Sequence, residues 1–313
     1  MLSVDKSLSE KNAIGIGRKG TINKPQLLHA PFWTVDTLFY LTPKANNNLI
    51  FLFYLFQNIN WSKYDESTGL PSLSKKTINN IKKNIPSNSE QKKIGNLLSK
   101  IDTAVTLLQK ELELKIALEQ YLRKHLLTIL KNNVPILRLK KYKYSWKNKS
   151  LEEVANIKTG SRNHQDSVPN GKYPFFVRSA NIEHLNEYDF DEKAILVPGD
   201  GKIGEIFHYY EGKFALHQRV YKIDKFKEID PKFLLNLFKN SFKKHAIRLN
   251  AQGTVPSLRL PMFTNWKIYM PTLSEQKQIA SILSSVEKSI ENDKNKIKSL
   301  DALKQFLLQN MFI

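Results

Sequence analysis

The chain has 313 residues, enough for two domains that each bury an apolar core. Its 49 lysines and arginines outnumber its 29 aspartates and glutamates, and the formal net charge of +20 points to a polyanionic partner, nucleic acid first. The lack of cysteine excludes disulfides, Cys-ligated zinc and thiol nucleophiles, and the apolar runs are too short for a signal peptide or a membrane span, so we expect a cytoplasmic protein without a membrane partner.

The first 85 residues predict a small α/β domain. Residues 11–41 favour strands, because apolar residues flank a glycine turn at residues 17–20 and residues 32–41 are β-branched and aromatic. Residues 49–58 follow as a short buried helix rich in Phe and Leu. We therefore assign residues 1–85 to a first domain.

A long helix is predicted over residues 86–131. Ser89 is its expected N-cap, and Glu90 lies in the first turn, where the helix dipole favours a negative charge. A helix of roughly 40 residues would extend about 60 Å, which is more than an ordinary domain needs. Its apolar residues follow the heptad spacing of a helix with one narrow seam for a partner helix. These residues are Ile94, Leu98, Ile101, Val105, Leu108 and Leu112.

A basic linker is predicted over residues 132–145. It lies in a stretch, residues 131–150, that contains seven basic residues and no acidic one. Such a stretch is either an ordinary solvated linker or, beside a duplex, a strap that contacts phosphates. The sequence leaves both interpretations open.

A second α/β domain is predicted over residues 146–270. A short helix at residues 151–155 opens it, and strands are expected at residues 173–177 and 194–197.

A second long helix is predicted over residues 271–313, because the Pro-x-x-Ser-Glu-Gln-x-x-Ile pattern of residues 86–94 reappears 185 residues later. We expect the two long helices to pack on each other. The second seam consists of Ile279, Leu283, Val286, Ile290 and Ile297.

The two domains share an order of elements, but the first is shorter. Nothing before Ala13 corresponds to residues 146–196, so the first domain lacks the equivalent of about fifty residues, including the counterpart of residues 178–181. The matching segments are residues 17–22 with 201–206 at an offset of 184, residues 51–58 with 233–240 at 182, and residues 68–73 with 253–258 at 185.

The sequence contains none of the common catalytic motifs. The chain has no phosphate-binding Gly-x-x-x-x-Gly-Lys-Ser/Thr loop, no nucleophile elbow, no His-Glu-x-x-His and no Asn-Pro-Pro-aromatic tetrapeptide of an adenine methyltransferase. Residues 113–115 fit half of a nuclease motif with Asp102 upstream, but on a helix they point to different faces. His208 and His217 lack metal-ligand spacing and are better explained as surface or core imidazoles. We expect no catalytic residue and no metal site.

The sequence offers more candidate residues for binding DNA than for catalysis. The glycine turns at residues 17–20 and 199–204 place bare backbone N–H groups beside cations, which suits phosphate contact, although a plain tight turn explains each one as well. Arginine reads guanine and Asn or Gln reads adenine through paired hydrogen bonds, whereas ordinary exposed polar loops carry the same residue types. The candidate DNA-binding residues are Arg18, Lys19, Lys158, Arg162, Arg178, Ser179, Asn181, Lys202, Gln218 and Arg219.

With its duplicated helix pattern at residues 86–94 and 271–279, the chain resembles the specificity (S) subunits of type I restriction–modification systems. Residues 151–160, the glycine turns and the Pro-Ser-Leu segments at residues 71–73 and 256–258 look like that family's target-recognition domains. The resemblance covers nearly the whole chain. It implies that each recognition domain reads half of a bipartite site in double-stranded DNA through the major groove, and that the helices set the gap between the half-sites.

The resemblance also implies that the helices dock methyltransferase (M) subunits and, through them, the restriction (R) subunit. Methylation with S-adenosylmethionine and ATP-driven cleavage would belong to those subunits, so we expect no enzyme activity and no cofactor in this chain.

We therefore expect an α/β (α+β) protein with two target-recognition domains, the first incomplete, separated by two long helices packed as an antiparallel coiled coil. The shortened first domain puts reading of one half-site in doubt. The alternative is a truncated protein that binds M subunits as a decoy or pairs with another partial S subunit.

Overall fold

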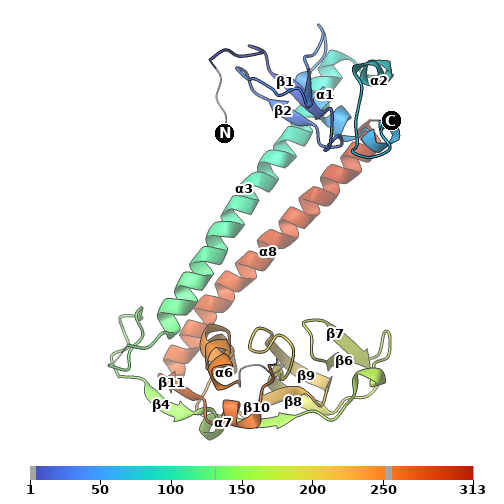
Figure 1. The fold of residues 1–313 in the computed structure, drawn as a ribbon. Coiled ribbons are helices and arrows are strands. Elements are labelled where there is room, and N and C mark those ends of the chain that lie inside the picture. Colours follow the sequence, from blue (N-terminus) through green and yellow to red (C-terminus); the bar gives the residue numbers. More distant parts are fainter. Residues whose placement is uncertain (1–4, 131, 251–255, 313) are drawn as a thin grey trace. The chain divides into compact units, whose positions relative to one another are not determined.

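The computed structural model describes residues 5–130, 132–250 and 256–312. The chain divides into two compact units (Figure 1). Unit 1 comprises Met1–Glu113 and Glu291–Ile313, and unit 2 comprises Leu114–Ile290. Each unit receives one part of the long helix α3 (Asn88–Leu127) and one part of the long helix α8 (Leu273–Met311).

Unit 1 is built around a small antiparallel sheet whose strands are ordered β2-β1-β3 in the described residues. The central strand β1 is buried along its whole length, and its Ile16 shares a core with Leu73. The strand predicted over residues 32–41 is shorter than expected, because the Leu38 N–H donates to the Val35 carbonyl at 3.1 Å in a turn that delays it. The elements before α3 are β1 (Ala13–Gly17), β2 (Gln26–Leu28), β3 (Leu38–Leu41), α1 (Leu49–Gln57), the 3-10 helix η1 (Trp61–Tyr64) and α2 (Lys75–Asn80).

Unit 2 contains a larger sheet, ordered β5-β10-β8-β9-β6-β7 within the described part of the chain, in which only β6 and β9 run parallel. Alternate residues of β8 enter different cores: Ile195 and Val197 belong to one, Ala194 and Leu196 to another. The apolar run of β8 therefore reflects burial of both faces. The strands are β5 (Asn156–Thr159), β6 (Tyr173–Phe176), β7 (Ile182–Leu185), β8 (Phe190–Pro198), β9 (His208–Leu216) and β10 (Val220–Asp224).

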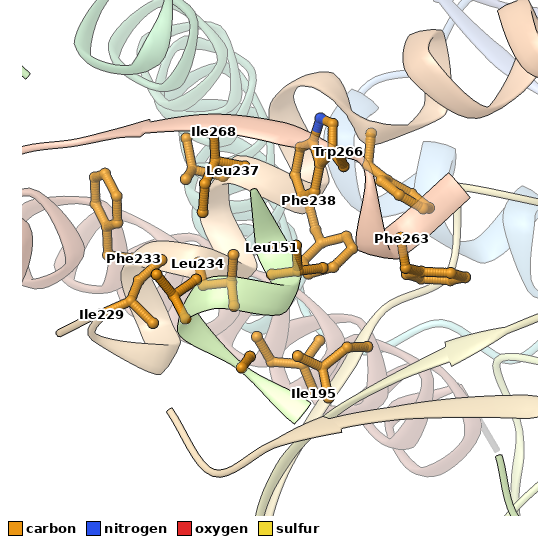
Figure 2. Close-up of a cluster of buried hydrophobic side chains, with 14 of the residues drawn as sticks. Leu151, Ile195, Ile229, Phe233, Leu234, Leu237, Phe238, Phe263, Trp266 and Ile268 are labelled. Atoms are coloured by element: carbon orange, nitrogen blue, oxygen red, sulfur yellow. The ribbon is translucent and has the colours of Figure 1, made fainter. Parts of the chain in front are cut away.

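Helices and a two-stranded ribbon pack around the main core of unit 2. Figure 2 shows Leu151 and Ile195 meeting Leu234, Phe238 and other aromatic and aliphatic side chains of this core. The ribbon pairs β4 with β11 in antiparallel register. These elements are β4 (Lys147–Ser150), α4 (Leu151–Val154), the 3-10 helix η2 (His164–Asp166), α5 (Pro231–Leu237), the π-helical turn η3 (Phe238–Phe242), α6 (Lys243–Leu249), α7 (Leu260–Thr264) and β11 (Lys267–Met270).

The long helices run antiparallel in each unit. In unit 1, Leu98 of α3 shares a core with Leu308 of α8, and Asp102 pairs with Lys304 at 2.6 Å. In unit 2, Arg123 pairs with Glu287 at 2.7 Å. In addition, Leu127 of α3 lies in one core with Ile279, Ala280 and Leu283 of α8. In both units, therefore, residues near the start of one helix lie against residues near the end of the other.

All of the predicted seam residues are fully or partly buried. Buried fully are Ile94, Leu98, Ile101, Val105, Ile279 and Leu283. Partly buried are Leu108, Leu112, Val286, Ile290 and Ile297.

The ends of the helices differ from the prediction. Helix α3 begins at Asn88, and the hydroxyl of Ser87 accepts the Glu90 N–H at 3.4 Å, so Ser89 is not the N-cap. Helix α3 ends at Leu127 instead of residue 131, because the chain turns back and the Leu130 N–H donates to the Val134 carbonyl at 2.9 Å.

Candidate nucleic-acid interface

Four loops of unit 2, which follow β5, β6, β8 and β9, lie together beside the large sheet. Hydrogen bonds between backbone atoms connect them. The Gln218 N–H donates to the Arg162 carbonyl at 2.9 Å, and the Gly199 N–H donates to the Arg219 carbonyl at 2.8 Å. We call these four loops the loop cluster; it consists of residues 160–163, 177–181, 199–204 and 217–219.

Arg178 and Asp200 form the centre of the loop cluster. The Arg178 Nη1 lies 3.3 Å from the Asp200 Oδ2, and 49% of the Arg178 side chain remains exposed. The Ser179 hydroxyl accepts the Asn181 N–H at 3.2 Å and donates to the Asn181 carbonyl at 3.1 Å, which tightens the loop that carries Arg178. Asp200 therefore orients a guanidinium that still faces solvent, as direct contact with a base edge requires.

Two histidines, the partly buried His208 and the buried His217, form hydrogen bonds with the loop cluster. The His208 Nε2 lies 3.2 Å from the Ser179 carbonyl, and the His217 Nδ1 accepts the Arg219 N–H at 2.9 Å. Burial lowers the pKa of both imidazoles, and nearby Arg178 lowers the pKa of His217 further. His217 is a core imidazole and His208 is partly buried, but their contacts with the loops could not be predicted from the sequence.

Acidification is expected to weaken unit 2. Burial holds the pKa of His208, His217 and His245 below the ordinary value of 6.5, so the unfolded chain takes up these protons more readily than the folded chain. The stability that the neutral imidazoles contribute is present above about pH 6.5 and is lost as the pH falls. Urea denaturation at about pH 7.5 and about pH 5.5 checks this. The variant His208→Asn should reduce the difference, whereas His29→Asn, at an exposed histidine of unit 1, should leave it unchanged.

The other predicted residues of unit 2 differ in their surroundings. The Arg162 guanidinium donates to Asp189 at 2.9 Å and to Glu187 at 3.0 Å, and these bonds raise its pKa. Two carboxylates of unit 2 therefore already pair with this guanidinium. The Gln218 Nε2 donates to the Asn163 Oδ1 at 2.5 Å, which holds the side chain on the surface of the cluster. Three further candidates are exposed, namely Lys158, Lys202 and Arg219.

The glycine turn of unit 1 has its counterpart at an offset of 181 residues, so the predicted offset of 184 is wrong. Gly20 and Gly201 have the same positive φ, 83° and 78°, and each accepts from the N–H two residues later. Lys19 and Asp200 likewise each bridge to a serine, Ser72 or Ser257. The repeated glycines allow sequence alignments at both offsets, and the shared backbone conformation of Gly20 and Gly201 favours the offset of 181.

This correction changes the two predicted phosphate contacts of unit 1. Lys19 occupies the position of Asp200 and not that of a residue near Lys202. Arg18 is exposed, and its guanidinium lies 5.7 Å from the centre of the Phe39 ring. The turn of unit 1 therefore has a cation, Lys19, where unit 2 has a carboxylate, Asp200.

The glutamine of the repeated helix pattern joins each long helix to its unit. In unit 2 the Gln276 Oε1 accepts the Asp230 N–H at 2.8 Å, and its Nε2 donates to the Pro271 carbonyl at 2.9 Å. In unit 1 the Gln91 Oε1 accepts the Asn48 N–H at 2.9 Å, and its Nε2 donates to the proline carbonyl of its own pattern at 2.9 Å. Both glutamines are buried, which explains why this residue recurs in the pattern.

The glutamate before each glutamine has a different environment in each unit. Glu275 is 1% exposed, and Arg138 donates to both of its carboxylate oxygens at 2.9 Å, with the Trp146 indole N–H at 3.4 Å. Glu90 is exposed. The basic linker therefore has a structural role at Arg138, which fixes it to the start of α8, and this role was not predicted.

The described residues hold no cluster of three His, Cys, Asp or Glu side chains suited to a metal ion. Asp102 of the half-motif for a nuclease accepts a hydrogen bond from Tyr54 at 2.7 Å and pairs with Lys304, both within unit 1. In the same ranges, no helix combines the length and apolar character that crossing a membrane needs.

A family model for the type I restriction modification DNA specificity domain matches residues 2–118 and 144–302. The chain is similar to the type I restriction enzyme EcoDI specificity subunit of Escherichia coli, with 31% identity over 163 residues, and to the MjaVIII specificity subunit of Methanocaldococcus jannaschii, with 26% identity over 279 residues. These matches cover 51% and 78% of this chain, which spans only 36% and 64% of the length of those relatives.

Solved structures are similar over almost the whole chain. An S subunit of a type I restriction–modification system from M. genitalium matches with a TM-score of 0.73 and 19% identity, over 99% of this chain and 85% of that one. The HsdS subunit from Thermoanaerobacter tengcongensis matches with a TM-score of 0.51 and 14% identity, over 98% and 81%. These likenesses confirm the predicted α/β (α+β) fold with its long helical region.

Proposed function

The chain belongs to the family of type I restriction–modification DNA specificity domains, and we propose that it is the DNA-recognition subunit of such a system. The observation that carries this proposal is the loop cluster. It presents Arg178, half exposed and oriented by Asp200, beside the exposed residues Lys202, Gln218 and Arg219. Arg178 would read a base edge, Gln218 would offer a second contact, and the lysine and the second arginine would contact phosphates.

We assign one half-site to unit 2, whose six-stranded sheet carries the loop cluster. The proposed role involves no catalytic residue of this chain; methylation and cleavage would be carried out by the M and R subunits. The proposal includes no cofactor.

Selection from a randomised duplex library tests the proposal. The purified chain, together with the M subunit, is incubated with the library, and bound duplexes are sequenced. We expect enrichment of one short motif that the loop cluster of unit 2 specifies. If no sequence is enriched, the recognition role is wrong.

We further propose that the long helices dock M subunits. In unit 2, α3 exposes Leu114, Leu118 and Tyr121, with exposed fractions of 66%, 48% and 53%. In unit 1, α8 exposes Leu303 and Phe306, which are the counterparts of Leu118 and Tyr121 at the 185-residue offset. Large apolar side chains at matching places on the outer faces of both helices are typical of a surface that binds another helix.

A charge on this surface is expected to prevent docking. The double variant Leu118→Lys and Phe306→Lys should weaken binding of the M subunit at least about tenfold, because each lysine would have to be desolvated in an apolar interface. Binding is measured by calorimetry. The control Gln120→Lys introduces one lysine at an exposed polar position of α3 and should bind normally. Equal affinities of both variants would contradict this docking surface.

A second candidate function rests on unit 1. Glu90 is exposed where its counterpart is paired, and β3 is an edge strand among the described residues, whereas its counterpart β10 is covered by β5. Such a protein would occupy M subunits as a decoy or pair with another partial S subunit. Binding of the M subunit without any sequence enrichment would favour the decoy, and a second enriched half-site on addition of another S subunit would favour pairing.

A further inference from the structure

A groove of about 940 Å³ lies on the helical side of unit 2, between α6 and the segment that joins α7 to β11. Five cations line it, and no carboxylate does. The cations are Lys239, Lys243, Lys244, Arg248 and Lys267.

Two of these cations have no carboxylate partner within the described ranges. Lys239 pairs with Glu287 at 2.7 Å, Lys243 pairs with Glu205 at 2.5 Å, and Lys267 lies 4.0 Å from a glutamate. Lys244 and Arg248 form no such pair, and both are exposed. They stand four residues apart on α6 and therefore on one side of the helix.

Both ends of α6 are attached to the loop cluster. At the start of the helix, a Cβ added to Gly204 would lie only 2.7 Å from the Lys243 Cα, so the loop after β8 packs directly against the helix. At its end, the Asn250 Oδ1 accepts the Ser257 N–H at 3.1 Å, and Ser257 bridges to Asp200. The helix that carries Lys244 and Arg248 is thereby fixed at both ends to the loop that carries Asp200 and Lys202.

The same part of unit 1 has the opposite charge. After α1 the chain continues through residues 58–71, where Asp65 and Glu66 occur and the only cation is Lys63. The matching stretch of unit 2, residues 240–256, contains three cations and no acidic residue. The Asp65 carboxylate accepts backbone N–H groups of its own loop, which lower its pKa. The basic helix is thus a property of unit 2.

We propose that Lys244 and Arg248 bind the phosphate backbone of duplex DNA just outside the half-site that the loop cluster reads, an inference that rests on the proposed function. Cations without protein partners, on a rigid helix beside a recognition loop, supply affinity without sequence information. The π-helical turn that leads into α6 fits this role, since such turns are frequent at functional sites.

Salt titration of DNA binding tests the inference. The double variant Lys244→Gln and Arg248→Gln is compared with wild type on duplexes that contain the enriched half-site. We expect the slope of log affinity against log salt concentration to become shallower by about 2, because each phosphate contact contributes about 0.9. Affinity at about 0.1 M salt should fall at least about tenfold, with the order of preference among target sequences unchanged.

The matched control is Lys294→Gln with Lys298→Gln, which removes the same charge from exposed positions of α8 in unit 1 and should keep the wild-type slope. Equal slopes for the two double variants would overturn the inference, and so would a change in sequence preference with an unchanged slope. If the wild-type chain itself selects no DNA sequence, the proposed function fails instead, and the two failures are distinguishable.

Discussion

Replacing Arg138 with Ala is expected to lower the local unfolding free energy at the start of α8 by about 3–5 kcal/mol, because the change strands a buried carboxylate. Glu275 is 1% exposed, and Arg138 supplies two of its hydrogen bonds. Native-state hydrogen exchange of the amides of β4, β11 and the first turns of α8 measures the effect. The same amides should exchange much faster in the variant.

Two controls test whether the effect comes from the unpaired Glu275 carboxylate. The variant Glu90→Gln changes the equivalent residue of unit 1, which is exposed, and should leave exchange in unit 1 within about 0.5 kcal/mol of wild type. The double variant Arg138→Met and Glu275→Leu removes both charges and should recover most of the loss, since two apolar partners leave nothing unpaired. A double variant no better than Arg138→Ala would show that Arg138 acts through packing alone.

Replacing Arg178 with Ala is expected to reduce discrimination at one base pair of the selected half-site by about 1–3 kcal/mol, because paired hydrogen bonds to a base edge are lost. Affinities for duplexes that differ at single positions give the measurement. Loss of preference should be confined to one position.

Arg219→Ala is the matched control, because this exposed arginine of the same loop cluster is proposed to contact phosphate. It should weaken all duplexes alike and reduce the salt dependence by about 1 unit of slope. Asp200→Asn removes the carboxylate that orients Arg178 and should also reduce discrimination. If Arg178→Ala behaves like Arg219→Ala, then Arg178 contacts phosphate and reads no base.

Patterns that depend on neighbouring residues were predictable from the sequence. The duplicated helix pattern and the spacing of residues such as Leu98 and Leu283 indicated two long helices with apolar seams, because helical periodicity is a local property. The capping residue was misassigned by two positions, since Ser87 and Ser89 are both suitable and only the backbone distinguishes them.

Contacts between distant residues were not predictable. Arg162 is a candidate DNA-binding residue, and its carboxylate partners Asp189 and Glu187 lie 27 and 25 residues away along the chain. Arg138 was one basic residue among seven in its stretch, and its partner Glu275 lies 137 residues away. Charge alone does not reveal which cations of a basic protein are already satisfied within it.

The buried glutamines Gln91 and Gln276 have a consequence for how such a protein changes over generations. Each one accepts a backbone N–H from a residue outside its helix pattern and donates to the proline carbonyl of its own pattern. Almost every residue type provides such backbone groups. These hydrogen bonds therefore place little demand on the side chains at the residues that donate or accept them. The apolar side chains that share a core with each helix, such as Phe51 with Leu98 and Phe233 with Ile279, are constrained more tightly, because a change in one of them leaves a cavity or a clash against the helix.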